Sequence, residues 1–186
     1  MKKIIVLLSM VLLCGLSARA QNLLSYKDSL DIYEGTWKYE NTQTKEIFII
    51  KLTQFTDHSQ SNVRYGYLGT YSYYKNSSEV VNSHGIKMPL NYLTAYYSIP
   101  LEVTFKIPIA LYCMGGASKL CLGFHDLTYK KYEAGGYVQL LSTKAGDEKL
   151  LWYPQNGEGT RTYIVGEPEE PDGFSVPVNV VMTKVH

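Results

Sequence analysis

The sequence is poor in the residues that build redox, metal and nucleophile sites. Its 186 residues include three cysteines and four scattered histidines, His58, His84, His125 and His186. It contains no Gly-x-Ser-x-Gly motif, no His-Glu-x-x-His motif and no glycine-rich phosphate loop. These absences argue against the common hydrolase and nucleotide-binding classes. The sequence therefore predicts a protein that is not an enzyme, with no catalytic residue, no metal site and no cofactor.

An excess of charge of one sign is also lacking. Lys and Arg total 18 residues against 17 for Asp and Glu, and the basic residues form no block. Proteins that bind nucleic acid or an anionic membrane surface through charge usually carry a basic cluster. We therefore expect neither partner here.

Only the N-terminus carries a long apolar run. Lys2 and Lys3 precede a largely apolar run over residues 4–13, and Ala18-Arg19-Ala20 places small side chains just before Gln21. The run is shorter than a membrane-spanning helix requires, and the whole pattern is typical of a secretory signal. We expect cleavage between Ala20 and Gln21.

The expected mature chain, residues 21–186, has the length of one domain and contains no transmembrane segment. Such a protein would be periplasmic or secreted. An alternative is lipid attachment at Cys14, although Leu13 is larger than the residue that usually precedes a lipid-modified cysteine.

Two cysteines remain after the expected cleavage, Cys113 and Cys121, with seven residues between them. An isolated close pair in an exported protein is typical of a disulfide, which would stabilise the fold by about 2–3 kcal/mol. His125 is the nearest further metal ligand, and it has no partner at a recognised zinc spacing. We predict a disulfide, with two free thiols as the alternative.

The expected mature chain is rich in Tyr, Val, Ile and Thr, and Asn, Ser, Gly and Pro interrupt it at short intervals, which is typical of strands joined by turns. A short helix or turn is expected over residues 22–33. Strands are expected over residues 36–40, 46–55, 63–74, 79–82, 92–98, 101–107, 120–126, 137–142, 149–153 and 174–185. We predict an all-β domain with a single antiparallel meander, most simply a lipocalin-like barrel, with a β-sandwich as the alternative.

Tyrosines recur in the longest of these strands, "VRYGYLGTYSYY" over residues 63–74. Because side chains alternate along a strand, its odd-numbered tyrosines share one face. They could form the wall of an apolar pocket or a platform for sugars, since a phenol combines ring area with a hydroxyl. The alternative is ordinary packing beneath a neighbouring strand, with the hydroxyls reaching solvent. The candidate ligand-binding residues are Trp37, Phe48, Ile50, Tyr65, Tyr67 and Tyr71.

Two polar clusters can be interpreted either as functional sites or as ordinary structural features. His125-Asp126 at a strand end could act as an acid–base pair, but turn hydrogen bonding accounts for it equally well. The acidic stretch around residues 167–172 could attract calcium, yet it lacks the alternating oxygen ligands of a calcium loop. A solvated hairpin loop is the simpler interpretation of that stretch.

The stretch "YEGTWKYE" is similar to the entry of lipocalins and related calycin barrels. In those proteins the Gly lets the chain bend into the first strand, and the Trp closes one end of the barrel beneath a basic side chain from a late strand. Gly35 and Trp37 match that pattern residue by residue. The resemblance implies a basic partner for Trp37, either Arg161 or Lys184.

A broader resemblance is carried by "LDIYEGTWKYENTQTKEIFIIKL", "YLGTYSYYKNSSEVVNS", "KLCLGFHD" and "EEPDGFSVPVNVVMTKV". Taken in order, these stretches resemble a domain-of-unknown-function family of small exported proteins from Bacteroidota, especially flavobacteria. The resemblance implies export and a β-rich fold, and it implies no activity. Two functions are therefore expected as alternatives. One is a barrel that binds a small apolar ligand, and the other is an envelope or surface interaction protein, adhesive or glycan-binding, with a filled core.

Overall fold

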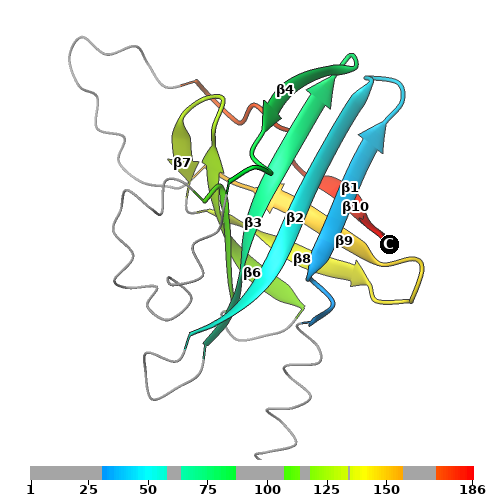
Figure 1. The fold of residues 1–186 in the computed structure, drawn as a ribbon, viewed down its shortest axis with the longest axis vertical. Coiled ribbons are helices and arrows are strands. Elements are labelled where there is room, and N and C mark those ends of the chain that lie inside the picture. Colours follow the sequence, from blue (N-terminus) through cyan, green and yellow to red (C-terminus); the bar gives the residue numbers. More distant parts are fainter. Residues whose placement is uncertain (1–30, 58–63, 87–106, 114–117, 134, 157–170) are drawn as a thin grey trace, which may run out of the picture. The chain divides into compact units, whose positions relative to one another are not determined.

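Ten β-strands make up the fold in a computed structural model, which describes residues 31–57, 64–86, 107–113, 118–133, 135–156 and 171–186. The strands are β1 Gly35–Asn41, β2 Glu46–Asp57, β3 Arg64–Lys75, β4 Ser78–Asn82, β5 Ile109–Cys113, β6 Lys119–Asp126, β7 Lys131–Glu133, β8 Gly136–Ser142, β9 Lys149–Pro154 and β10 Val180–Val185 (Figure 1). All of them lie in one unit, Tyr33–His186, and Met1–Ile32 is a second unit. Within the described residues, no helix is long and apolar enough to cross a bilayer.

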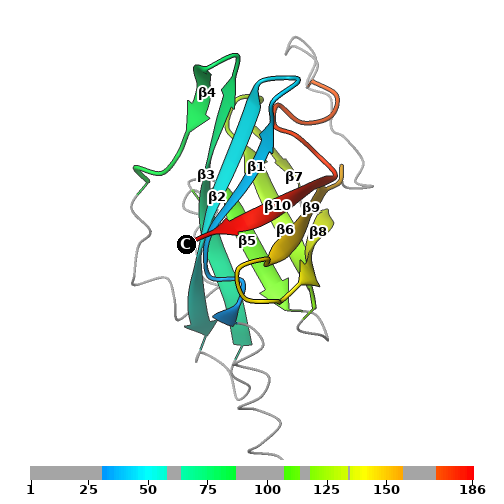
Figure 2. The ribbon, with the colours of Figure 1, turned by 90° about the vertical axis from the view of Figure 1, so that its right-hand side faces the viewer.

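Eight of the strands close into an antiparallel barrel. Their order around the ring is β2, β1, β10, β9, β8, β6, β5 and β3, and pairing of β2 with β3 completes the circle. Figure 2 shows β10 between β1 and β9, so the last strand pairs with the first. The predicted all-β meander is therefore confirmed, and the barrel rather than the sandwich is the form that it takes.

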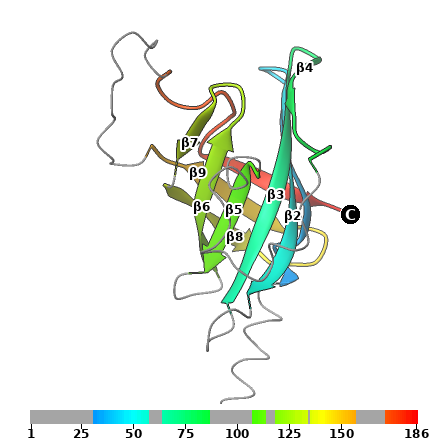
Figure 3. The same ribbon diagram turned by 60° about the vertical axis from the view of Figure 1, so that its left-hand side comes forward.

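Two short strands extend beyond the ring at the same end of the barrel as the β1–β2 turn. β4 continues the sheet beyond the upper half of β3, and β7 pairs with the last three residues of β6. Figure 3 shows them on separate sides of this end, which we call the mouth. The opposite end, where β1 begins and β10 ends, is called the closed end.

Alternating sequence patterns account for most of the barrel wall. In β2 the buried Phe48, Ile50 and Leu52 alternate with residues that are at least partly exposed, and β9 has the burial pattern of one face in and one face out along its whole length. β2 and β3 pair in unbroken register from Glu46 opposite Lys75 to Asp57 opposite Arg64. The period of two therefore places one face of each strand in the core.

Some strands differ from those expected. β5 follows Pro108 and was not expected. Of the strand expected over residues 101–107 only Ile107 is described, and it is not part of a strand; residues 92–98 and 101–106 lie outside the described residues. The last strand begins at Val180 rather than at residue 174. Residues 174–179 leave the ladder because Phe174 and Ser175 bind across the mouth and Asn179 has a φ of 55°.

The N-terminal expectations are largely outside the described residues. The signal sequence, the Ala20–Gln21 cleavage site and Cys14 all fall before residue 31. Of the expected helical segment over residues 22–33, only the last three residues are described, and they end in a turn that leads to Gly35.

Candidate functional site

The residues expected to line a ligand site all come from the first three strands. Trp37, Phe48, Ile50, Tyr67 and Tyr71 each have 0% of their surface exposed, and all five lie inside the barrel. Tyr65 belongs to β3, but its side chain lies outside the description. The sequence therefore identified interior residues correctly, and their burial decides what the interior can hold.

Aromatic rings fill the interior towards the mouth. Phe48 lies at the centre of this network, with ring centroids 6.0 Å from Tyr71, 6.5 Å from Tyr73 and 5.5 Å from Trp152. Phe124 extends the network, at 5.2 Å from Tyr71 and 5.3 Å from Trp152. Edge-to-face and tilted contacts at these separations are the favourable arrangement for aromatic pairs.

The packing leaves no space beside these rings. A side chain that lines a cavity large enough for one water molecule has surface that a water-sized sphere can reach. Phe48, Tyr71, Phe124 and Trp152 have none, and neither do Ile50, Ile109 and Leu150. A ligand among these residues would have to displace side chains.

Trp152 carries a polar group with no conventional partner. Its Nε1–H is buried and has no hydrogen-bond acceptor among the described residues. The indole lies edge to face with Phe124 at 90° and with Phe48 at 62°. Trp152 has no exposed surface, so the structure leaves no room for a water beside this group.

At the closed end, Lys184 covers Trp37. Its Nζ lies 5.5 Å from the centre of the Trp37 ring, and the two residues are register partners in β10 and β1. The Trp37 Nε1–H donates to the Tyr33 carbonyl oxygen at 2.8 Å. Gly35 has a φ of 115°, and a Cβ there would lie 3.3 Å from Lys184 Cε. The basic partner left open between Arg161 and Lys184 is thus Lys184 among the described residues.

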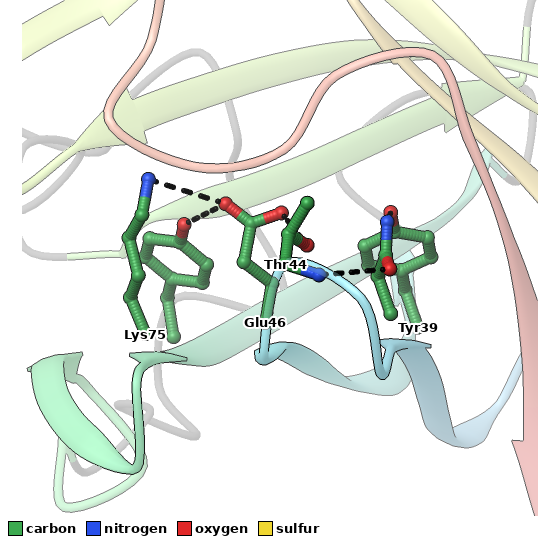
Figure 4. Close-up of polar contacts among 6 residues, drawn as sticks. Tyr39, Thr44, Glu46 and Lys75 are labelled. Atoms are coloured by element: carbon green, nitrogen blue, oxygen red, sulfur yellow. Dashed lines mark hydrogen bonds and ion pairs between the residues drawn. The ribbon is translucent and has the colours of Figure 1, made fainter.

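A polar cluster borders the mouth beside the β1–β2 turn (Figure 4). Glu46 accepts hydrogen bonds from the Tyr73 hydroxyl at 2.7 Å and the Thr44 hydroxyl at 2.7 Å, and Lys75 Nζ lies 3.4 Å from the same carboxylate. These donors, led by Thr44 and then Tyr73, hold the pKa of Glu46 below its ordinary value. These three contacts with Thr44, Tyr73 and Lys75 link the β1–β2 turn to β3.

The hydroxyls of Tyr71 and Tyr73 bind other groups of the protein, whereas the packing alternative expected the tyrosine hydroxyls to reach solvent. Tyr71 Oη accepts a hydrogen bond from the Leu127 N–H at 2.8 Å, and Tyr73 donates to Glu46. Burial raises the pKa of both phenols well above the ordinary value of 10. The tyrosines therefore act as structural links between strands and turns.

Asp126 anchors the chain across the mouth. It is completely buried, and its two oxygens accept hydrogen bonds from the Ser175 N–H at 2.5 Å and the Ser175 hydroxyl at 2.6 Å. The same carboxylate accepts from the N–H groups of Thr128 and Tyr129 at 3.1 Å each. The bonds from Thr128 and Tyr129 are the turn hydrogen bonding that the sequence offered as one interpretation of His125-Asp126.

The cysteines are not joined in this structure. Cys121 has an exposed, free thiol. The register pairs Cys121 with Tyr112, and Cys113 with Leu120. Since directly opposed residues share a face and successive residues alternate, this register does not place the two cysteines on one face. The predicted Cys113–Cys121 disulfide is therefore absent here.

Other polar groups form no metal site within the described part of the chain. No set of three or more His, Cys, Asp and Glu side chains lies close enough there to hold an ion. Glu167, Glu169 and Glu170 of the acidic stretch fall outside the described residues, and Asp172 is exposed.

Sequence reasoning missed the partners that act over long separations. Ser175 is 49 residues from Asp126, and Tyr73 is 27 residues from Glu46. No local pattern marks such pairs. Trp152 could have been found, because it sits at an inward position of the alternating strand "KLLWYP".

Comparison with known proteins places the chain at the level of a family. Residues 1–185 match the model of a family of unknown function, DUF6705. The chain belongs to this family. Membership in a family of unknown function, expected from the sequence, is thus confirmed, and in this DUF6705 chain the fold is an eight-stranded barrel. No curated protein and no solved structure matches it.

Proposed function

We propose that this protein is a non-enzymatic interaction module whose barrel is filled by its own side chains and which binds its partner on its outer surface. The observation that carries the proposal is the complete burial of Trp37, Phe48, Ile50, Tyr67 and Tyr71. A ligand-binding barrel of this size keeps an apolar cavity between such residues, whereas here the rings contact one another.

The polar groups near the mouth support the same proposal. Glu46 and Asp126 are occupied by hydrogen bonds that hold a turn and the 171–176 segment in place. A general acid or base must reach a substrate with the proton it transfers. Carboxylates already engaged in fastening the fold are poorly suited to that task.

The two tryptophans offer a direct test, because they are the only tryptophans in the chain and both lie inside the barrel. We expect emission typical of a buried indole, weak quenching by acrylamide, and no change on addition of palmitate or an anilinonaphthalene sulfonate. Trp152→Phe leaves Trp37 to report on the closed end, and Trp37→Phe leaves Trp152 to report on the mouth side. Native mass spectrometry should give the mass of the bare chain.

A bound mass that is lost on denaturation would contradict the filled barrel and favour the apolar-ligand function instead. So would saturable quenching of either tryptophan by palmitate. Comparison of the two single-tryptophan variants would then show which end of the barrel had opened.

Export is part of the proposal. It is supported by the basic start, the apolar run and the small residues before Gln21, and by the resemblance to exported Bacteroidota proteins. Protein recovered from the periplasm or medium of an expressing cell should begin at Gln21 by N-terminal mass analysis. Incorporation of labelled palmitate that is abolished by Cys14→Ser would show lipid attachment instead.

A further inference from the structure

Two tyrosines stack on the outside of the barrel. Tyr137 of β8 and Tyr153 of β9 are register partners, with ring centroids 4.9 Å apart and planes inclined by 29°. Both are partly exposed. Lys119 of β6 places its Nζ 3.6 Å from the centre of the Tyr137 ring. We call this row of Lys119, Tyr137 and Tyr153 the tyrosine platform.

The row ends at Tyr153. The pairing between β9 and β10 stops with Val180 opposite Trp152, and Asn179 before it leaves the ladder with a φ of 55°. No strand residue in the described part of the chain is therefore paired with Tyr153 on the side away from Tyr137. That side of the ring is the place where a further flat group can extend the stack.

Polar side chains lie beside the two stacked rings. Gln155 Nε2 donates to the Tyr153 hydroxyl at the long distance of 3.4 Å, and Gln139 is the register partner of both Lys119 and Leu151. The exposed Lys119 ammonium has no carboxylate partner within the described residues, whereas Lys38, Lys75 and Lys149 each have one.

We propose that the tyrosine platform binds a carbohydrate chain that carries carboxylates. The apolar face of one sugar stacks on the free side of Tyr153, and the amide of Gln155 and the tyrosine hydroxyls meet the sugar hydroxyls. Tyr137 lies between Lys119 and Tyr153, so Lys119 is not next to the sugar that stacks on Tyr153. A carboxylate that contacts Lys119 must therefore belong to another sugar of the same carbohydrate chain. The ligand is therefore an acidic oligosaccharide or polysaccharide rather than a single sugar.

A proline-rich peptide is the other partner that tyrosines commonly bind. Peptides of that kind dock in grooves lined by several aromatic residues. Here the two rings stand on the outer face of a closed barrel and are stacked on each other, and the free cation beside them favours a negatively charged ligand. The inference rests on the proposed function, since it names a partner for the outer surface.

The test compares polygalacturonate with its fully methyl-esterified form, which has the same sugars without the charge, by affinity electrophoresis and calorimetry. We expect the protein to bind the acidic polymer more tightly, with an affinity that falls as salt rises. Tyr153→Ala should weaken binding of both polymers about tenfold, which corresponds to the loss of one aromatic stacking contact. Lys119→Gln should remove the preference for the acidic polymer and leave binding of the ester unchanged.

Matched controls are available on the same barrel. Tyr74 of β3 is another partly exposed tyrosine, and its hydroxyl donates a hydrogen bond to Glu79 of β4. Lys144 is an exposed lysine in the β8–β9 turn. Tyr74→Ala and Lys144→Gln should leave both affinities unchanged. Tyr153→Phe keeps the ring and removes only the hydroxyl, so it should weaken binding clearly less than Tyr153→Ala, which separates loss of stacking from loss of folding.

Three results would overturn the proposal. They are no binding of either polymer by the native protein, equal weakening by the Tyr74 and Tyr153 variants, or binding of a proline-rich peptide that depends on Tyr153. Each leaves the filled barrel standing, because the tryptophan and native-mass measurements test the interior separately.

Discussion

Tyrosines lie on both sides of this barrel wall, and the two groups have different surroundings. Tyr67, Tyr71 and Tyr73 of β3 face inward, almost without exposed surface, while Tyr137 and Tyr153 stand on the outer face and stack on each other. The inner hydroxyls of Tyr71 and Tyr73 are committed to single partners within the protein. A tyrosine-rich strand therefore does not by itself mark a binding site. Tyrosines that face inward fill the core, and only those on the outer face are accessible to a partner.

The largest contrast should come from deleting one ring on each side. Phe48→Ala removes the centre of the aromatic network, and we expect it to lower the free energy of unfolding by about 3–5 kcal/mol because a cavity is left. Tyr153→Ala removes one cross-strand pair and should cost about 1 kcal/mol or less. Urea unfolding of both variants measures the difference. Similar losses would mean that the interior is not the main core.

The strands differ in how well the sequence predicts them. β1, β2 and β3 were predicted nearly to their ends, because their inner and outer residues alternate and polar turns separate them. β5 was missed because its residues are apolar on both faces: Ile109 and Leu111 point into the barrel, and Ala110 belongs to an outer apolar cluster with Phe55, Leu68 and Ile107. A strand covered on both sides has no period of two to detect.

The candidate site was predicted in its residues but not in its role. Alternation identified Trp37, Phe48, Ile50, Tyr67 and Tyr71 as one interior set. Whether such a set surrounds a cavity or fills it depends on residues from the opposite wall, such as Trp152 and Phe124, and no pattern within one strand contains that information. Closure of the barrel is a long-range property.

The next contrast concerns carboxylates. Asp126→Asn turns one acceptor oxygen into a donor that faces the donors of Ser175, and we expect a loss of about 2–3 kcal/mol. Asp147→Asn is the matched surface change, since Asp147 pairs with Lys149 at 3.0 Å with both side chains exposed, and it should cost about 1 kcal/mol or less. Urea unfolding measures the stability of both. Equal losses would show that the bonds across the mouth do not persist in solution.

Removing single hydroxyls tests the inner and outer tyrosines directly. Tyr71→Phe leaves the Leu127 N–H without its acceptor and should cost about 1–2 kcal/mol, whereas Tyr137→Phe should change stability by less than about 0.5 kcal/mol. Because the folded pKa of Tyr71 is raised above 10, its contribution is present below pH 10 and is lost as the pH rises further. Stability measured above pH 10 should therefore fall less steeply in Tyr71→Phe than in the native protein.

A smaller effect is expected at acid pH. The folded pKa of Glu46 lies below its ordinary value of 4.5, so its contribution is complete above that pH and is lost as the pH falls through the folded pKa. Tyr73→Phe removes one donor, and the pKa of Glu46 should move back towards 4.5. The free energy of unfolding should change by less than about 1 kcal/mol, because the substitution removes one hydrogen bond to a partly exposed carboxylate. Carboxyl titration by NMR would follow it, and an unmoved pKa would assign the shift to Thr44 and Lys75 alone.

The smallest expected effect is at Cys121. Its thiol is exposed and free, and its register partner is Tyr112 rather than Cys113, so Cys121→Ser should leave the midpoint of urea unfolding within error. A disulfide closing this short loop would instead make the same substitution cost about 2–3 kcal/mol. Thiol titration of the oxidised, denatured mature protein provides an independent count, with two reactive groups expected for the register observed here. A count of zero would mean that the β5–β6 hairpin adopts another register when exported. Such a register would also change the position of Tyr112 and Cys121 relative to Tyr137, which belongs to the tyrosine platform.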